Sequence, residues 1–281
     1  MLVSRQELSF DFKGARFSLD SQSDREFLTW IFSQFLYGEI TGIQCGHWLY
    51  HAPHFQAATF IAKQATEELS HVRRFLRIFS LLGTKPQPPH GLIRFLTTGM
   101  MGKNWGEHVA MEMALGEGLV LGIFYAMLET IGDSEIKKII ESSIVEEERH
   151  CEFGEIETLA WIKKHPSHRK VLLALAVIQS WAMKWLKRFC SAYFRKSRDH
   201  VVLSQLEAFF DHTIRCFELR VEMLGLSKVP FKDMGAIEKG TLIFALPFRR
   251  AVHRLTVRPK LLTSTYLSDP VIYAESERFK G

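Results

Sequence analysis

Two Glu-x-x-His motifs carry the residue types in this sequence that are best suited to binding a metal ion. Glu68 is followed three positions later by His71, and Glu147 is followed in the same way by His150. On a helix this spacing places both side chains on one face, and carboxylate and imidazole groups are common ligands of divalent metals. One copy alone predicts little, because both residue types are common on solvated helix surfaces.

A repeated spacing joins the two motifs into one pattern. Glu39 lies 29 positions before Glu68, and Glu117 lies 30 positions before Glu147. At a rise of ~1.5 Å per residue, such a separation lets the chain follow one helix, turn, and return to the same level on the next. The sequence therefore predicts that four carboxylates and two imidazoles meet. Burying that much negative charge is costly unless cations neutralise it, as two divalent metal ions would.

The predicted metal ligands, which would also be the catalytic residues, are Glu39, Glu68, His71, Glu117, Glu147 and His150. With Glu117 as a ligand, the second half of the pattern follows the first by 78 or 79 positions throughout. Glu112 lies on the same predicted helix and is the alternative, but it breaks the match between the halves. The spacing therefore favours Glu117.

Helical periodicity and capping signals predict the elements that carry these residues. The predicted helices span residues 23–50, 53–82, 104–131, 134–165, 171–196 and 201–226. Ser23, with Glu26 three positions later, has the spacing of a capping box at the start of the first helix. Gly83 and the prolines after it end the second. Long helices with short connections and no regular alternation of strands predict an all-α bundle.

The other segments flank this bundle in a single predicted domain, residues 1–281. Alternating apolar and polar residues in the N-terminal extension, 1–22, predict a short hairpin that turns at Lys13 and Gly14. Residues 23–165 would form the metal-binding four-helix bundle, and 166–226 would add further helices. Closely spaced prolines and glycines predict that 227–281 are an irregular tail that wraps the bundle.

The ligand pattern resembles that of the ferritin-like di-iron carboxylate superfamily, over residues 23–165. Members carry one Glu or Asp on each of two helices and Glu-x-x-His on the other two. His150 followed by Phe153 and Gly154 is similar to the continuation in several oxygenases of the superfamily, including aldehyde-deformylating oxygenase. The resemblance implies a ferritin-like four-helix bundle with additional C-terminal helices, which binds two iron ions or one manganese and one iron. It also implies that Glu67 and Glu146 hydrogen-bond the ligand histidines.

Two positions narrow the chemistry that the resemblance implies. Phe75, four residues after His71, stands where ribonucleotide reductase small subunits that store a tyrosyl radical carry tyrosine. Leu121, one turn after Glu117, replaces the threonine typical of multicomponent monooxygenases. We therefore expect an O2-activating oxidoreductase, an oxygenase or oxidase, that acts on a hydrophobic organic substrate such as an acyl chain or aldehyde. The alternatives are an iron-handling protein of ferroxidase type and a transfer RNA-modifying hydroxylase.

Composition indicates a globular protein. Hydrophobic residues make up 47% of the chain and charged residues 24%, and the four cysteines form no Cys-x-x-Cys pair. The first 20 residues lack the apolar core of a secretory signal, and the apolar run 171–183 is too short to span a bilayer. A cytoplasmic location is therefore expected.

The expected partners follow from the chemistry and from the charge. They are O2, a small hydrophobic substrate and an electron-donor protein. A net charge of +5 and the basic, aromatic segment 181–198 add an acyl carrier protein, with RNA or a membrane surface as weaker expectations. A homodimer is compatible with a bundle of this kind.

Overall fold

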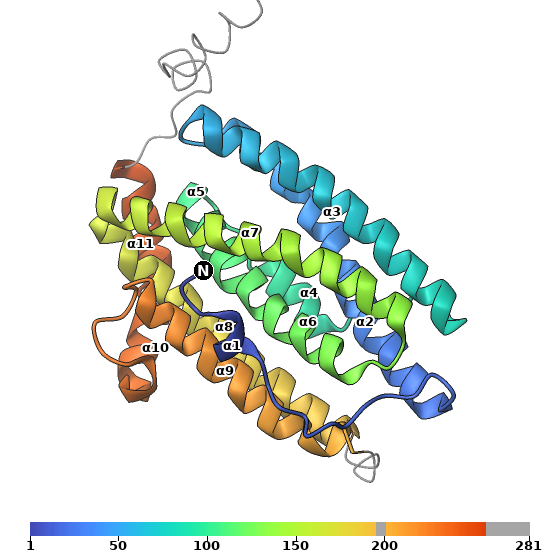
Figure 1. Ribbon diagram of the computed structural model, residues 1–281. Coiled ribbons are helices and arrows are strands. Elements are labelled where there is room, and N and C mark those ends of the chain that lie inside the picture. Colours follow the sequence, from blue (N-terminus) through green and yellow to red (C-terminus); the bar gives the residue numbers. More distant parts are fainter. Residues whose placement is uncertain (195–200, 257–281) are drawn as a thin grey trace, which may run out of the picture.

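Helices dominate the chain in the computed structural model, which describes residues 1–194 and 201–256 (Figure 1). Within these ranges the only β pairing is an isolated bridge between Phe17 and Ile131. The prediction of an all-α bundle is confirmed.

Four long helical segments surround the predicted ligands. They are α2 (Gln22–Gly42), α3 (Phe55–Leu82), the continuous segment α5, η3 and α6 (Trp105–Glu107, His108–Glu117, Gly118–Thr130) and α7 (Ser134–Lys164). Thr29 near the start of α2 hydrogen-bonds Thr84 just beyond the end of α3. Further along α2, Glu39 contacts His71, so these two helices run antiparallel. The helix predicted over 23–50 is α-helical only as far as Gly42, because residues Ile43–Tyr50 form a 3₁₀-helix, η1.

The ends of these helices follow from their capping residues. Ser21, rather than the predicted Ser23, caps α2, and its hydroxyl accepts a hydrogen bond from the Asp24 backbone N–H. Gly83 ends α3 as predicted, because its φ of 66° is in the left-handed region that glycine adopts without strain. Asp133 caps α7 by accepting from two backbone N–H groups.

A π-helix interrupts the segment that was predicted as one α-helix over 104–131. Residues His108–Glu117 form η3, in which each backbone hydrogen bond spans five residues. Glu112 and Glu117 are five positions apart, so this winding brings both onto one side of the segment. Long π-helical turns are rare and are found mainly at functional sites.

The N-terminal extension is not the predicted hairpin. The chain forms a single turn of helix, α1 (Arg5–Leu8), and then a stretch that pairs with no strand in the part of the chain that the structure describes. The predicted turn is present, since Lys13 and Gly14 both have positive φ. Beyond it the Phe17 N–H donates to the Thr130 carbonyl at 2.8 Å. Aromatic side chains of this stretch pack into the core, so the apolar alternation reflects burial against the bundle rather than pairing in a sheet.

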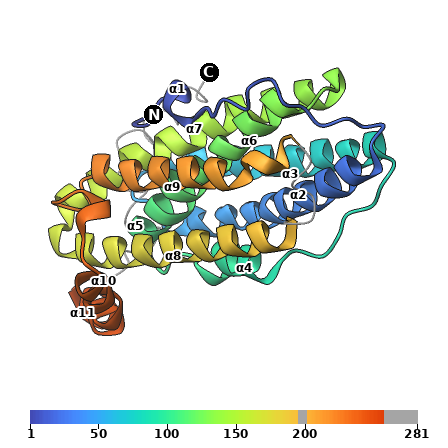
Figure 2. The same cartoon turned by 90° about the horizontal axis from the view of Figure 1, so that it is seen from below.

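The C-terminal helices cover one side of the bundle (Figure 2). They are α8 (Arg169–Tyr193), α9 (Leu206–Met223), α10 (Ala236–Phe244) and α11 (Leu246–Thr256). The predicted irregular tail is therefore wrong over α10 and α11. Gly235 caps α10, and Pro247 lies in the first turn of α11, where no backbone donor is needed. Residues 195–200 and 257–281, which complete the predicted fifth helix and tail, lie outside the described residues.

One helical segment, Trp105–Thr130, is long and apolar enough to cross a membrane by length and composition alone. In this structure 67% of its most apolar 18-residue stretch is buried. The segment packs against α7 and α9 as a core helix of the bundle. The cytoplasmic location stays a prediction.

Candidate metal centre

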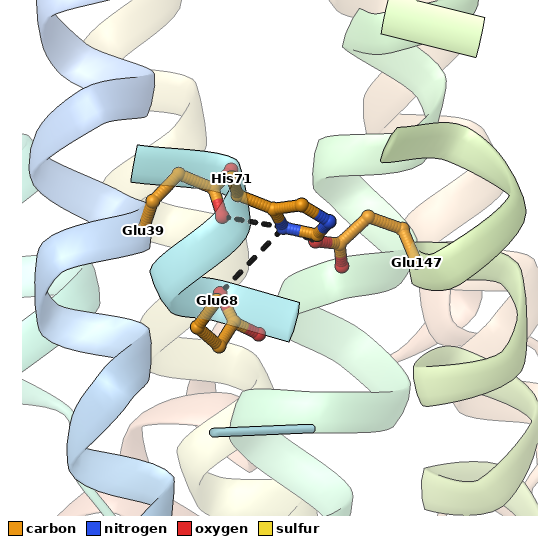
Figure 3. A group of neighbouring side chains, drawn as sticks. All are labelled: Glu39, Glu68, His71 and Glu147. Atoms are coloured by element: carbon orange, nitrogen blue, oxygen red, sulfur yellow. Dashed lines mark hydrogen bonds and ion pairs between the residues drawn. The ribbon is translucent and has the colours of Figure 1, made fainter. Parts of the chain in front are cut away.

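All six predicted ligands converge in the middle of the bundle. Their donor atoms form two groups that share Glu68: one holds Glu39, Glu68, His71 and Glu147, and the other holds Glu68, Glu117 and His150. Figure 3 shows the first group, in which the carboxylates come from α2, α3 and α7. Within each group the atoms lie within 4.8 Å of one another. The predicted spacing pattern therefore corresponds to one site.

Both histidines point the same ring nitrogen into the site. His71 Nδ1 lies 2.9 Å from a Glu39 oxygen and 3.1 Å from a Glu147 oxygen. His150 Nδ1 lies 3.6 Å from oxygens of Glu68 and Glu147. A carboxylate oxygen is an acceptor, so the short His71 contacts require a proton between the atoms or a metal cation in its place.

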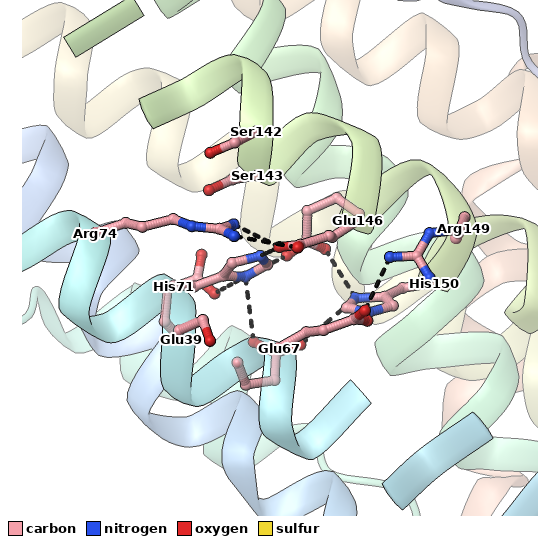
Figure 4. A network of polar contacts seen from close by, with 12 residues as sticks. Glu39, Glu67, His71, Arg74, Ser142, Ser143, Glu146, Arg149 and His150 are labelled. Carbon is pink, nitrogen blue, oxygen red and sulfur yellow. Dashed lines mark hydrogen bonds and ion pairs between the residues drawn. The ribbon is translucent and has the colours of Figure 1, made fainter. Parts of the chain in front are cut away.

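The outward nitrogens are held by carboxylates from the opposite helix (Figure 4). His71 on α3 donates its Nε2–H to Glu146 on α7 at 2.7 Å. His150 on α7 donates its Nε2–H to Glu67 on α3 at 2.8 Å. The hydrogen bonds expected for Glu67 and Glu146 are confirmed, and each one crosses between the two helices. Fixing Nε2 as the protonated nitrogen leaves the Nδ1 lone pair directed into the site, as in metal-bound histidines.

Two arginines complete these contacts and were missed at the sequence level. Arg74 binds Glu146 with both terminal nitrogens, one of them at 3.1 Å, and Arg149 Nη2 lies 2.9 Å from Glu67. Each arginine neutralises an outer carboxylate. These two glutamates therefore add no net negative charge to the site.

The carboxylates of Glu39, Glu68, Glu117 and Glu147 are buried close to one another, and the nearby cationic groups do not balance their negative charge. Burial raises the pKa of Glu39, Glu68 and Glu117, and the Glu147 carboxylate raises it further. Burial also works against the charged form of His71, but hydrogen bonds to Glu147 and Glu39 outweigh it and raise the His71 pKa to about 11. The metal-free site therefore favours bound protons. Metal cations would replace those protons.

The residues present fit a pair of divalent metal ions. Four glutamates with a formal charge of −4 match two ions of +2, with both histidines neutral. Glu117 Oε2 and His150 Nδ1 are buried and have no hydrogen-bond partner among the described residues, although such atoms are normally paired. A ligand set of carboxylates and imidazoles suits iron and manganese. The donor set and the two unpartnered atoms therefore support the predicted metal site.

Glu117, rather than Glu112, belongs to the site. Gln64 lies on α3, one turn before Glu68. Its Nε2–H donates a hydrogen bond of 2.7 Å to Glu117. Glu112 instead contacts His108 at 3.0 Å and accepts from the Gly102 backbone N–H. Sequence reasoning missed Gln64, although its position four residues before Glu68 places it on the same face of α3.

A closely packed glycine sets the position of Glu68. A Cβ atom added at Gly42 would lie 2.7 Å from Glu68 Oε2. We expect Gly42→Ala to displace this carboxylate and weaken metal binding by roughly 10-fold, the lower end of effects seen when ligand positioning is disturbed. Isothermal titration of the metal-free protein with Mn²⁺ would measure this loss of affinity. Gly46→Ala is the control, because its Cβ would meet only Ala65 at 3.9 Å, and equal losses in both variants would contradict the assignment.

An apolar cavity of about 280 Å³ begins at the site. Glu39, Glu68, Glu117 and Glu147 line one part of it, and it follows α2 towards Phe27. Gly42 and Val120 are part of its wall, together with side chains from α4, α6, α8 and α9. Phe27 and Glu39 are twelve positions apart on α2, which corresponds to about 18 Å. An elongated apolar molecule could therefore reach the metal ligands from the interior.

No family model, curated protein or solved structure matches this chain. The identification of a metal centre accordingly depends on the donor set, its burial and the orientation of the two histidines.

Proposed function

We propose that the protein is a ferritin-like di-metal oxidoreductase that uses O2 to oxidise an elongated hydrophobic substrate. The single observation that carries this proposal is the position of the four glutamates of the donor set in the wall of the apolar cavity. Glu39, Glu68, His71, Glu117, Glu147 and His150 would hold two iron ions, or one manganese and one iron. When bound, these ions would supply O2 activation.

The chain's own residues would position the reactants and exclude water. Phe35, Val120 and Ile123 line the cavity and would keep the reacting part of the substrate dry. Gln64 holds Glu117 by a hydrogen bond, while Glu67 and Glu146 hold the two histidines. Phe75 is fully buried between Phe32, Phe35 and Phe124, so this position offers no oxidisable phenol. An electron-donor protein would be needed for turnover.

The proposal is tested by comparing metal loading with O2 consumption. Metal-free protein is loaded with Fe(II), or with Mn(II) and Fe(II), without oxygen, and O2 uptake is followed with a chemical reductant and a series of acyl aldehydes of increasing length. We expect about two metal ions per chain and O2 uptake in excess of the iron present only when a long aldehyde is added. Uptake limited to the amount of iron for every aldehyde would instead favour the ferroxidase alternative.

A cavity variant separates substrate binding from metal binding. Gly38 lines the cavity one position before Glu39, and an added Cβ there would meet no atom of the described residues within 4 Å. Gly38→Phe is expected to retain both metals but to lose at least about 10-fold of the aldehyde-stimulated O2 uptake, because the ring would fill the cavity. Unchanged stimulation would show that the substrate does not enter by this cavity.

A further inference from the structure

Helix α8 separates the cavity from the surface. Its cavity-lining residues Gln179, Met183, Leu186 and Cys190 share one face. Trp181 and Trp185 lie on the opposite face, as 3.6 residues per turn requires, and are 42% and 60% exposed. Exposed tryptophans in adjacent turns of a helix are unusual on a surface that contacts only water.

A second segment beside α8 has the same two-sided character. Helix α4 (Gly91–Arg94) continues as a short π-helix, η2 (Phe95–Gly99). Ile93, Leu96 and Thr97 line the cavity, whereas Phe95 is 41% exposed. The His90 ring at the start of α4 packs against Phe189 of α8 at 4.2 Å. The thin wall between cavity and surface is therefore made of α8 and the α4–η2 segment.

Helices α10 and α11 extend this surface. Figure 2 shows them on the same side as α4 and α8, along the lower edge of the view, and both pack on α8. Phe244 and Phe248 are 89% and 74% exposed, and Ile237 is similarly exposed. The inner side of α11 is fixed by Arg250, which binds the fully buried Glu107 through two nitrogens. The exposed phenylalanines therefore belong to an anchored element.

The segments that form this surface are basic. Residues 84–103 and 181–194 each contain three Lys or Arg and no Asp or Glu, and residues 228–252 contain five against two. Lys184 and Lys187 pair with Glu218 and Asp211 of α9, and Arg250 pairs with Glu107. The other eight cations of these segments still outnumber their two carboxylates. Arg94 and Arg188 are exposed. The Arg188 guanidinium lies over the Trp185 ring, 5.2 Å from its centroid, which is a cation–π contact. Aromatic and aliphatic side chains framed by cations are typical of surfaces that lie in a bilayer interface.

We propose that this face, formed by α4–η2, α8, α10 and α11, docks on an anionic phospholipid bilayer, and that the hydrophobic substrate enters the cavity from the lipid phase. Phe95, Trp181, Trp185, Ile237, Phe244 and Phe248 would enter the interface, and the surrounding Lys and Arg would attract the lipid phosphates. The entry route rests on the proposed function, whereas docking does not. An apolar acyl chain could thus pass from the bilayer to the metal site with little exposure to water.

The docking is tested by flotation of the full chain with vesicles of phosphatidylcholine alone or of an equal mixture with phosphatidylglycerol. We expect binding to the anionic vesicles to be at least about 10-fold tighter and to weaken with added salt, since each surface cation contributes separately. Two double variants should each lower the affinity for anionic vesicles by about 10-fold or more. One is Trp181→Gln with Trp185→Gln, and the other is Phe244→Gln with Phe248→Gln. Val145→Gln with Ile156→Gln is the matched control, because both residues are equally exposed apolar positions on α7, and it should bind like the wild type.

The other outcomes would overturn the proposal. Equal binding to both vesicle types, no binding, or equal losses in the control would contradict it. If the tryptophan and phenylalanine variants instead change the oligomeric state in sedimentation, the face is an interface between copies of the chain. Retention on RNA without vesicle binding would identify a nucleic acid as the partner. A Glu68→Gln protein that binds vesicles normally but consumes no O2 would separate docking from the oxidation chemistry.

Discussion

Replacing Glu68 by glutamine is expected to reduce the metal content from about two ions per chain to fewer than one. Glu68 is the residue shared by both donor groups, so its loss affects both ions. Glutamine keeps the shape of the side chain and removes its charge. We expect the affinity for metal to fall by at least about 100-fold, which is more than the loss of a supporting residue causes. Elemental analysis measures the metal content, and titration with Mn²⁺ measures the affinity.

The same substitution should stabilise the metal-free protein. Burial and the carboxylates of Glu147 and Glu39 raise the Glu68 pKa, which shows that the charged form is disfavoured there. Removing this charge relieves its repulsion with the neighbouring carboxylates, so the metal-free variant should be more stable than the metal-free wild type. Added metal should stabilise only the wild type. Urea unfolding with and without metal measures both effects. A lower stability of metal-free Glu68→Gln, with unchanged metal content, would identify the cluster as a structural ion-pair network.

Glu112 provides the matched control for this experiment. It lies on the same side of the π-helix as Glu117 and also lines the cavity, but it belongs to neither donor group. Glu112→Gln should therefore retain about two metal ions per chain. Loss of metal in this variant would show that the ligand set extends along the π-helix.

Gly154→Ala is expected to destabilise the protein by about 3 kcal/mol, the upper range for an overpacked core. An added Cβ would lie 2.5 Å from Met113 Cβ, 2.6 Å from the Ala114 nitrogen and 2.9 Å from the Val109 carbonyl oxygen. Two of these neighbours are backbone atoms, so α7 and η3 would have to separate. Because α7 carries His150 and η3 ends at Glu117, metal affinity should fall as well. Urea unfolding and Mn²⁺ titration measure the two effects.

Gly38→Ala is the control for a glycine inside a helix. Within residues 1–194 and 201–256, its added Cβ would meet no atom within 4 Å, and alanine favours the helix over glycine. A gain of about 0.5–1 kcal/mol is therefore expected at this position. If both variants lost stability equally, the close approach at Gly154 would not be the cause.

The convergence of the six predicted ligands was predictable because it depends on local sequence spacing. Glu68 with His71, and Glu147 with His150, depend only on helical spacing, and the separations from Glu39 and Glu117 depend only on helix length. The structure confirms that these side chains meet. Gly154 was noted only through a resemblance, and its physical reason is the backbone contact with η3.

Other features were not predictable because distant contacts decide them. The π-helical winding of η3 has no periodic signature, because its apolar residues are spread around the segment. Helix α11 depends on Arg250 reaching Glu107, which lies 143 positions earlier. The N-terminal alternation is the same for a strand in a sheet and for an extended chain packed on a bundle. Only tertiary structure separates these cases.

The crossed hydrogen bonds between α3 and α7 have a consequence for metal loading. Each histidine is oriented by a glutamate on the other helix, so the spacing of α3 and α7 sets the direction of both Nδ1 lone pairs at once. The first ion to bind would draw ligands from both helices and fix this spacing for the second. We therefore expect the two ions to bind cooperatively, so that chains with a single ion are scarce at every metal concentration.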